Sequence, residues 1–489
     1  MESYKLISFL FFLLFFLELL KQISYILFGI GKKKEKEKEK KNTYVMMTAE
    51  NCGEHCLEIE DDYTMAELCK SNLTSSIQGK LCKKSPISSK CSIFRVPHRL
   101  HKEKERIEPL LVSIGPFHHG KKKLQTMEEI KLWYLHCLLN RAPTRETTLE
   151  CFIEAIKSIE QECRACYAGE IDHQVEKKFI EMMVVDGCFI VEFFRKYSEE
   201  VRQDKEDPVF NTSWMVWEIT NDLFLLENQL PWRVIDCLFN LTQSNAERSS
   251  LLNLLNFFLQ DVICIRIHAD RQIQYKHLLD CLRNSMAETY QVTKADHLPM
   301  LPSFKVVPIP SVTELRQAGV KFEAGRMEDS LNVTFKDGVM TIPEIQVSEI
   351  TKTILLNLIV FEHCDRSGDH KITSYVKLLK DLVNTSEEVD FLKKKKIFKM
   401  YMSSEKVASG FNKAYNDAYN DYVFLYSHLY NDVNAYCSRR RNKWRTILKR
   451  DYFNNPWTTF SVLAATVIVV FTLIQTFYSV LSYHRPTSK

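Results

Sequence analysis

Histidines near the start of the central region are the first residues whose type and spacing suggest chemistry. His118 and His119 are adjacent, and His98 and His101 precede them, so together they could bind a metal ion or transfer protons. Adjacent histidines reach one ion only where the backbone turns sharply. The simpler interpretation is that Gly115-Pro116 forms a turn and the imidazoles bond to nearby backbone groups. We favour this structural interpretation and predict no metal ligand here.

The fifteen cysteines are scattered along the chain. Cys163-x-x-Cys166 has no second CxxC and no spaced histidine pair, so no structural zinc site is predicted. Cys188, in the string Asp186-Gly187-Cys188, lies in an apolar, helix-like run and has no evident base, which favours a buried thiol over a nucleophile. An odd number of scattered cysteines favours free thiols in a reducing compartment over a disulfide framework.

Carboxylates and amides gather between residues 222 and 229. Asp222 and Glu227 could form a paired-carboxylate site, but their spacing alone is weak evidence for one. Glu227, Asn228 and Gln229 precede Leu230-Pro231, where the chain must change direction. We expect these three side chains to satisfy backbone donors and acceptors at that turn. Ligand binding at this position is the alternative.

The chain lacks the short motifs of nucleotide-binding proteins, zinc peptidases and serine hydrolases, which makes those functions less favoured. Asp365–His370 faintly resembles a calcium loop but lacks its ligand spacing and terminal glutamate. The Lys393–Lys396 run predicts a solvated face. A net charge of +4 gives no argument for nucleic acid as a partner. We therefore predict no catalytic, cofactor-binding or metal residues and no enzymatic activity.

Hydrophobic periodicity predicts a mainly helical body. Residues 93–124 contain three prolines and are expected to be irregular. In LNVTFKDGVMTIP, apolar residues alternate around Asp337-Gly338, which predicts a β-hairpin with a type I′ turn. The predicted helices are 126–141, Thr147–Cys166, Val175–Tyr197, Trp214–Phe239, Leu251–Leu259, His277–Met286, Glu349–Glu362, Ile372–Asn384 and Phe424–Asp451.

The C-terminal region carries a candidate membrane span. From Phe460 to Ser482 the only strongly polar side chain is Gln475, and a helix of this length rises about 35 Å. That length is sufficient to cross a hydrocarbon core of about 30 Å. Trp457 and Tyr483 flank the run, as interfacial aromatic residues do. The alternative is a buried core helix, although core helices seldom run this long without charge.

The N-terminus leaves topology open. Ile7–Leu17 resembles the core of a signal peptide, but Glu18 follows and no cleavage site is evident. The segment is a signal peptide, a second span, an interfacial helix or a gene-model artefact. Lysines between Lys32 and Lys41 and basic residues between Arg439 and Arg450 favour a cytosolic body, and the second cluster predicts attraction to anionic lipid. Five Asn-x-Ser/Thr triplets keep a type I ectodomain as the alternative.

Several strings occur in order along the chain: IFRVPHRL, VSIGPFHHG, MEEIK, MMVVDGCFIVEFFR, DLFLLENQLPW, AGVKF, VTFKDGVMTIP, LLNLIVFE, TSYVKLLKDLV, YFNNPWTTFSVLAA and LIQTFYSVLSY. In these strings the chain resembles the plant family called domain of unknown function 247, from about Ile93 to Tyr483. The resemblance implies a single-pass membrane protein with a helical body and no established enzymatic activity. Some grass members are implicated in self-incompatibility, which implies a recognition or signalling role. Arg106-Ile107-Glu108-Pro109 departs from the family's Ala-Tyr-x-Pro, so a large buried ring is absent there.

These observations predict a mainly α-helical protein with one large helical domain, a short β-hairpin and one C-terminal transmembrane helix. The expected function is non-enzymatic recognition or signalling through an unknown protein partner, with membrane lipid contacting the span and the plasma membrane as one candidate location. The alternatives are a type I ectodomain receptor and an enzyme that uses the His118/His119 or Asp222/Glu227 region. The expected segments are an N-terminal hydrophobic segment (1–31), a charged, disordered linker (32–90), the body (91–451), the span (457–483) and a short tail (484–489).

Overall fold

The computed structural model describes residues 73–81, 88–97, 105–141, 148–169, 171–243, 250–267, 273–288, 305–365, 370–416, 423–439 and 456–484. The chain divides into two compact units, Met1–Lys83 and Lys84–Lys489. In the first unit, residues 73–80 form an exposed helix inside the segment predicted to be a disordered linker. The predicted N-terminal hydrophobic segment, the lysine-rich run and both His98 and His101 lie outside the described residues.

The second unit is mainly helical, as predicted. Its first helices are η2 (Lys122–Leu124), α3 (Gln125–Asn140), α4 (Leu149–Arg164), α5 (His173–Lys177), α6 (Phe179–Tyr197), α7 (Ser213–Leu223), α8 (Trp232–Leu241), α9 (Leu251–Ile263) and α10 (Leu278–Glu288). Those that follow are α11 (Val312–Ala318), η6 (Met327–Asp329), α12 (Glu349–Cys364), α13 (Lys371–Leu382), α14 (Ser386–Lys394), α15 (Ser404–Asn416), α16 (Ser427–Ser438) and α18 (Pro456–His484).

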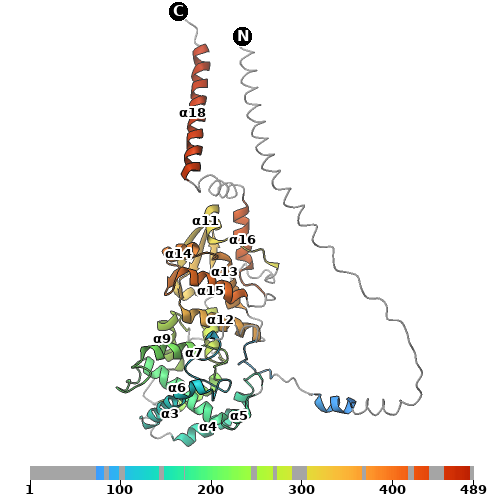
Figure 1. The fold of residues 1–489 in the computed structure, drawn as a ribbon, viewed down its shortest axis with the longest axis vertical. Coiled ribbons are helices and arrows are strands. Elements are labelled where there is room, and N and C mark those ends of the chain that lie inside the picture. The colour runs from blue at the N-terminus through green and yellow to red at the C-terminus, as the bar shows by residue number, and fades with distance from the viewer. Residues whose placement is uncertain are drawn as a thin grey trace, which may run out of the picture. The chain divides into compact units, whose positions relative to one another are not determined.

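Helix α6 forms the centre of the N-terminal half of the body. Every residue from Met182 to Lys196 is buried, and α3, α4, α8 and α9 pack against it. A helix that is apolar on nearly all sides must be surrounded by other elements, and Figure 1 shows α6 among its neighbours at one end of the body. Gly187 allows α8 to pack closely against α6, because a Cβ at this position would lie 2.5 Å from the Leu238 side chain of α8.

The C-terminal half is built around α12 and α13. Helix α13 packs against α10, α12 and α15, and α12 also contacts α7, which joins the two halves. Two small sheets accompany these helices. Strand β3 (Val339–Pro343) pairs in parallel with β1 (Lys321–Gly325) and antiparallel with β2 (Thr334–Lys336), and β4 (Ile345–Val347) pairs in parallel with β5 (Phe398–Met400).

Polar side chains begin several of these helices. Ser348 accepts a hydrogen bond from the Thr351 N–H at the start of α12. Thr385 and Glu388 form a capping box at the start of α14, in which each side chain accepts from the other residue's N–H. These bonds satisfy donors that the first turn of a helix leaves unpaired, each contributing about 1 kcal/mol. Short polar motifs therefore fix the starts of helices that flank the core.

The predicted hairpin is confirmed. Thr334–Lys336 and Val339–Pro343 pair across Asp337 and Gly338, whose φ angles of 51° and 78° are those of a type I′ turn. The parallel pairing of β1 and the second sheet were not predicted. The predicted helix Trp214–Phe239 was wrong as one element, because the segment between α7 and α8 is non-helical. The predicted helix Phe424–Asp451 corresponds to α16, and residues 440–455 lie outside the described part.

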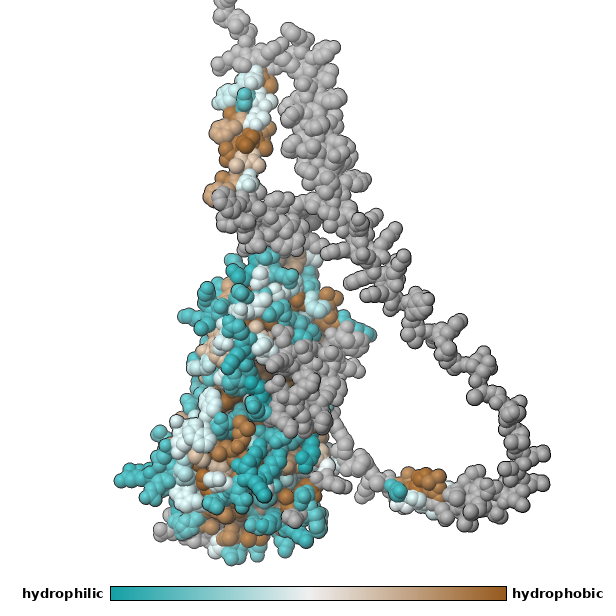
Figure 2. All heavy atoms as spheres, viewed as in Figure 1, coloured by the Kyte–Doolittle hydropathy of each residue, from teal (hydrophilic) through white to brown (hydrophobic). Residues whose placement is uncertain are grey.

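Helix α18 is the only described helix that is both long and apolar enough to cross a membrane. Its most apolar window, Leu463–Val480, has a mean hydropathy of 1.9, and none of that window is buried. Figure 2 shows this helix as mostly brown and white, whereas the surface of the body is largely teal. The 29 residues rise about 43 Å. The structure therefore does not support the alternative interpretation of this helix as a buried core helix.

Candidate functional site

The irregular segment before η2 is held by carboxylates and amides from the end of α7 and from the turn that follows it. Asp222 accepts hydrogen bonds from the backbone N–H groups of Leu110, Leu111 and Val112, at 3.0, 2.7 and 2.8 Å. Burial raises the pKa of Asp222 to about 6, although these three bonds favour its charged form. One side chain therefore replaces the secondary-structure partners that three consecutive residues lack.

The two amides of the turn act in the same way. Asn228 accepts from the N–H of Ile114 at 2.7 Å and donates to the carbonyls of Val112 and Asp222. Gln229 donates to the carbonyls of Leu223 and Leu225 and accepts from the N–H of Leu279. The structure thus places both amides where backbone groups need partners, in agreement with the expected structural role.

Asp186 forms a buried ion cluster next to this segment. Its carboxylate accepts from the N–H of Gly115 at 2.8 Å and from Lys131 Nζ at 2.5 Å. Lys131, on α3, also donates to the carbonyl of Ser113 at 2.7 Å and lies 2.7 Å from Glu128 Oε1. Both Lys131 and Asp186 are buried. Gly115 has a φ of 75°, and a Cβ there would lie 2.7 Å from the carbonyl oxygen of Gln229, so only glycine fits.

His118 and Glu227, which belonged to two separate candidate regions in the sequence, are partners in the structure. His118 Nε2 lies 3.0 Å from Glu227 Oε2, and Glu227 Oε1 accepts from the N–H of Val96 at 2.7 Å. Burial raises the pKa of Glu227, but the bonds from His118 and Val96 outweigh it and the pKa ends below its usual value. Asp222 and Glu227 therefore bind different backbone segments and do not share a proton as a catalytic carboxylate pair would.

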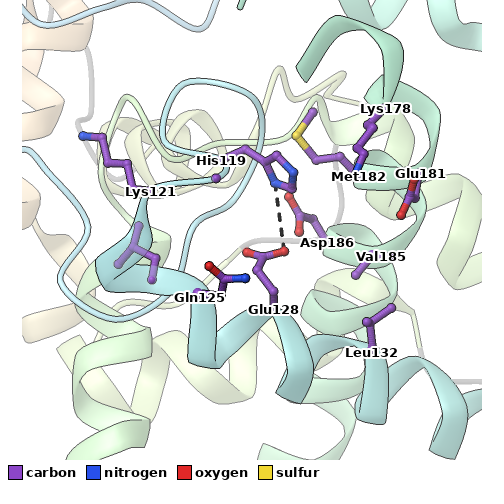
Figure 3. Close-up of a pocket in the computed structure, with 12 residues that line it drawn as sticks. His119, Lys121, Gln125, Glu128, Leu132, Lys178, Glu181, Met182, Val185 and Asp186 are labelled. Carbon is purple, nitrogen blue, oxygen red and sulfur yellow. Dashed lines mark ion pairs between the residues drawn. The ribbon is translucent and has the colours of Figure 1, made fainter. Parts of the chain in front are cut away.

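His119 has a different environment from His118. It lines a cavity of about 350 Å³ between the first turns of α3 and α6 (Figure 3), and its Nδ1 lies 4.0 Å from Glu128 Oε2. Gln125, Asp186 and Met182 also face this space. Leu124, Leu132 and Val185 supply apolar wall. Of the four side chains named as alternative catalytic candidates, only His119 lines this cavity.

The cysteines of the candidate motifs, Cys163, Cys166 and Cys188, occupy structural positions. Cys188 is buried in α6, and burial raises the pKa of its thiol, which disfavours the reactive thiolate. Cys163 is buried near the end of α4, and burial raises its pKa to about 12. Cys166 Sγ lies 3.3 Å from the carbonyl oxygen of Glu162, one turn earlier. Within the described ranges every cysteine is free, and no group of three or more metal-ligand side chains could hold an ion.

The remaining sequence candidates lie at the surface or in ion pairs. Asp365 pairs with Lys276 at 2.6 Å and with Arg283 at 3.1 Å, and residues 366–369 of the suspected calcium loop lie outside the described part. Lys393–Lys396 are exposed at the end of α14, as predicted. Ile107, at the position that departs from the family pattern, is buried in place of the larger ring.

Sequence reasoning missed Lys131, the cation at the centre of the ion cluster. Lys131 is four residues after Met127 and three before Tyr134, so it occupies the buried stripe of α3. The sequence signal that could have indicated this cluster is a lysine on the apolar stripe of a predicted helix. A second cluster was missed for the same reason: Lys196 Nζ lies 2.7 Å from Asp207 Oδ2, and Tyr134 Oη donates to the same carboxylate.

The described part of the chain is mainly helical and has one apolar C-terminal helix that is long enough to cross a membrane. Residues 93–471 match the family described as a plant protein of unknown function, DUF247, and the chain belongs to that family. It is 30% identical to the UPF0481 protein At3g47200 of Arabidopsis thaliana, over 80% of this chain and 87% of the relative. It is 23% identical to the putative UPF0481 protein At3g02645 of the same plant, over 80% and 90% respectively. No solved structure matches the chain significantly.

Proposed function

We propose that this is a non-enzymatic protein that is anchored in a membrane by α18 and binds another protein through the body. The observation that carries the proposal is a pair of exposed tryptophans on α7. Trp214 is 58% exposed and Trp217 is 49% exposed. They are three residues apart and so lie on one side of the helix. Tryptophan is among the residues most enriched at the energetic centres of protein interfaces.

The opposite side of α7 already has its partners. Met215, Ile219 and Leu223 are buried in the core, and α7 packs against α12. The fold therefore does not need the tryptophan side for its own stability. Large exposed aromatic side chains on a helix anchored in this way are typical of a surface that another protein covers.

An enzyme acting at the candidate residues has less support. His118, Asp222 and Glu227 make contacts inside the fold, and each of them is buried. Three of the four candidate side chains thus make contacts inside the fold. The fourth, His119, lines a cavity but has no carboxylate of the described residues within direct hydrogen-bond range, which favours the surface over an active site. For topology, the basic residues between Arg439 and Arg450 and the free cysteines support a cytosolic body.

The test compares the full-length protein with its Trp214→Ser/Trp217→Ser variant after chemical crosslinking in plant membranes. The control is Leu149→Ser, which changes an exposed apolar residue on α4. We expect a discrete crosslinked protein species in the wild type and the control, reduced about tenfold or more in the tryptophan variant. Equal unfolding temperatures establish that all three proteins are folded. An unchanged species would show that α7 is not the surface, and no species in any form would contradict protein binding.

A further inference from the structure

The cavity beside His119 is large enough to hold a small molecule. Its volume of about 350 Å³ falls within the usual range for small-molecule sites, roughly 300–1,000 Å³. Two helices and one loop build it, so its walls are fixed by the packing of α3 against α6. Leu124, Met182 and Val185 provide apolar surface, and all of them are anchored in buried positions.

Two hydrogen-bond acceptors converge on this space without bonding to each other. His119 Nδ1 is buried and has no hydrogen-bond partner among the described residues. Glu128 Oε2 lies 4.0 Å away, too far for a direct bond, and Figure 3 shows the ring and the carboxylate facing one another. A donor nitrogen placed between them would reach both atoms at about 2.9 Å.

The charges around the cavity favour a cation. One lysine, Lys131, lies between two carboxylates, 2.7 Å from Glu128 and 2.5 Å from Asp186, which leaves an excess of one formal negative charge. Lys121 and Lys123 share Glu108, at 3.4 and 3.9 Å, which leaves one positive charge there. Lys121 points away from His119 in Figure 3, so the negative excess stays on the His119 side of the cavity. Lys178 and Glu181 at the rim cancel one another formally.

We propose that this cavity binds a small primary amine with a compact apolar body. The ammonium group lies between His119 and Glu128 and donates hydrogen bonds to both, and the apolar body contacts Leu124, Leu132 and Met182. This site is separate from the tryptophan surface on α7, so it does not depend on the proposed protein binding.

The test uses three probes of one shape that differ in charge: benzylamine, benzyl alcohol and benzoate. Each is titrated into the full-length protein in detergent by isothermal titration calorimetry. We expect benzylamine to bind, benzyl alcohol to bind about tenfold or more weakly, and benzoate not to bind. Benzyl alcohol lacks the positive charge that strengthens the hydrogen bonds of the amine, and the negative charge of benzoate is repelled by Glu128. Benzoate binding, or equal binding of alcohol and amine, would overturn the proposal.

Two variants locate the binding. Glu128→Gln keeps the size of the side chain but removes its charge, and we expect it to weaken benzylamine binding about tenfold or more. Leu132→Trp enlarges a residue that is 54% exposed at the rim, so it fills the cavity without disturbing the ion cluster. Leu149→Trp, on α4, is the matched control. Retained benzylamine binding in Leu132→Trp would place the amine elsewhere, even where Glu128→Gln fails to fold.

Discussion

Gly338 lies directly against the ring of Tyr436. A Cβ at this glycine would lie 2.5 Å from Tyr436 Oη and 2.7 Å from Cζ. Phe335, on β2, contacts the same ring edge-on, with 5.5 Å between the centroids. The tip of the hairpin is thereby fixed to α16, the last described helix before α18.

This contact predicts that Gly338→Ala lowers the free energy of unfolding by about 2–4 kcal/mol, from positive-φ strain plus the collision with Tyr436. Gly120→Ala is the control, because Gly120 has a φ of 79° and nothing within 4 Å of its added Cβ. We expect it to cost about 1 kcal/mol, from strain alone. Denaturant unfolding of the full-length protein in detergent measures both. Equal losses would mean that the Tyr436 contact contributes nothing.

The hairpin was predictable because its signal is local, with alternating apolar residues around a two-residue turn. The hydrogen-bond partners of Asp222, Glu227 and Asn228 could not be predicted from the local sequence. The carboxylate of Glu227 accepts a hydrogen bond from the N–H of Val96, 131 residues away, and no sequence motif near Val96 indicates that partner. The sequence predicted that Glu227, Asn228 and Gln229 would satisfy backbone groups at their own turn. Gln229 does so, whereas most of the bonds of the others reach the distant, irregular backbone at Val96 and at Leu110–Ile114.

Lys131→Met should lower the free energy of unfolding by about 3–5 kcal/mol, because it leaves the carboxylates of Asp186 and Glu128 without their cation. The double variant Lys131→Met/Asp186→Asn should lose less than the sum of the two single changes. Lys121→Met is the control, since its pair with Glu108 is partly exposed and is expected to contribute under about 1 kcal/mol. Urea unfolding midpoints check this, and additive losses would contradict a coupled cluster.

Glu362 predicts a pH dependence with an unusual sign. It is fully buried and accepts hydrogen bonds from Ile372 and Thr373, and burial raises its pKa to about 7. The folded state thus holds a proton that the unfolded state loses near pH 4.5, so stability is highest at low pH and falls as pH rises towards 7. The slope reaches at most about 1.4 kcal/mol per pH unit.

Glu362→Gln removes this titration, so the difference in unfolding free energy between wild type and variant should change between pH 5 and pH 8. His277 acts in the opposite direction, because burial lowers its pKa to about 4 and its contribution is lost as pH falls below 6.5. Both proteins contain His277, so its effect cancels in the difference. A difference that stays constant across this range would show that Glu362 is ionised in the folded state.

Removal of Phe460–Lys489 should release the body from membranes, because this deletion takes away the apolar window of α18. The measurement is carbonate extraction of microsomes that contain the full-length or truncated chain. A deletion confined to the tail after His484 is the control and should remain in the pellet. If the truncated chain also resists carbonate, the Ile7–Leu17 segment anchors it too.

Topology can be determined from the acceptor sites for N-glycans. Asn211, Asn240 and Asn384 are exposed, so an oligosaccharyltransferase in the lumen would find them at the surface. Basic residues between Lys32 and Lys41 and between Arg439 and Arg450 favour a cytosolic body. We therefore predict that all five triplets, including those at Asn72 and Asn332, stay unmodified in the native protein.

Endoglycosidase treatment of the native protein, followed by electrophoresis, tests this topology. No mobility shift is expected. The control is a chain with a cleavable signal peptide in place of residues 1–31, which carries the body into the lumen by design. Asn211 and Asn384 lie in non-helical segments, where glycosylation requires no unwinding, and we expect this control to shift. A shift in the control alone would assign the body to the cytosol, whereas a shift in the native protein would favour an ectodomain receptor and reverse the proposed orientation.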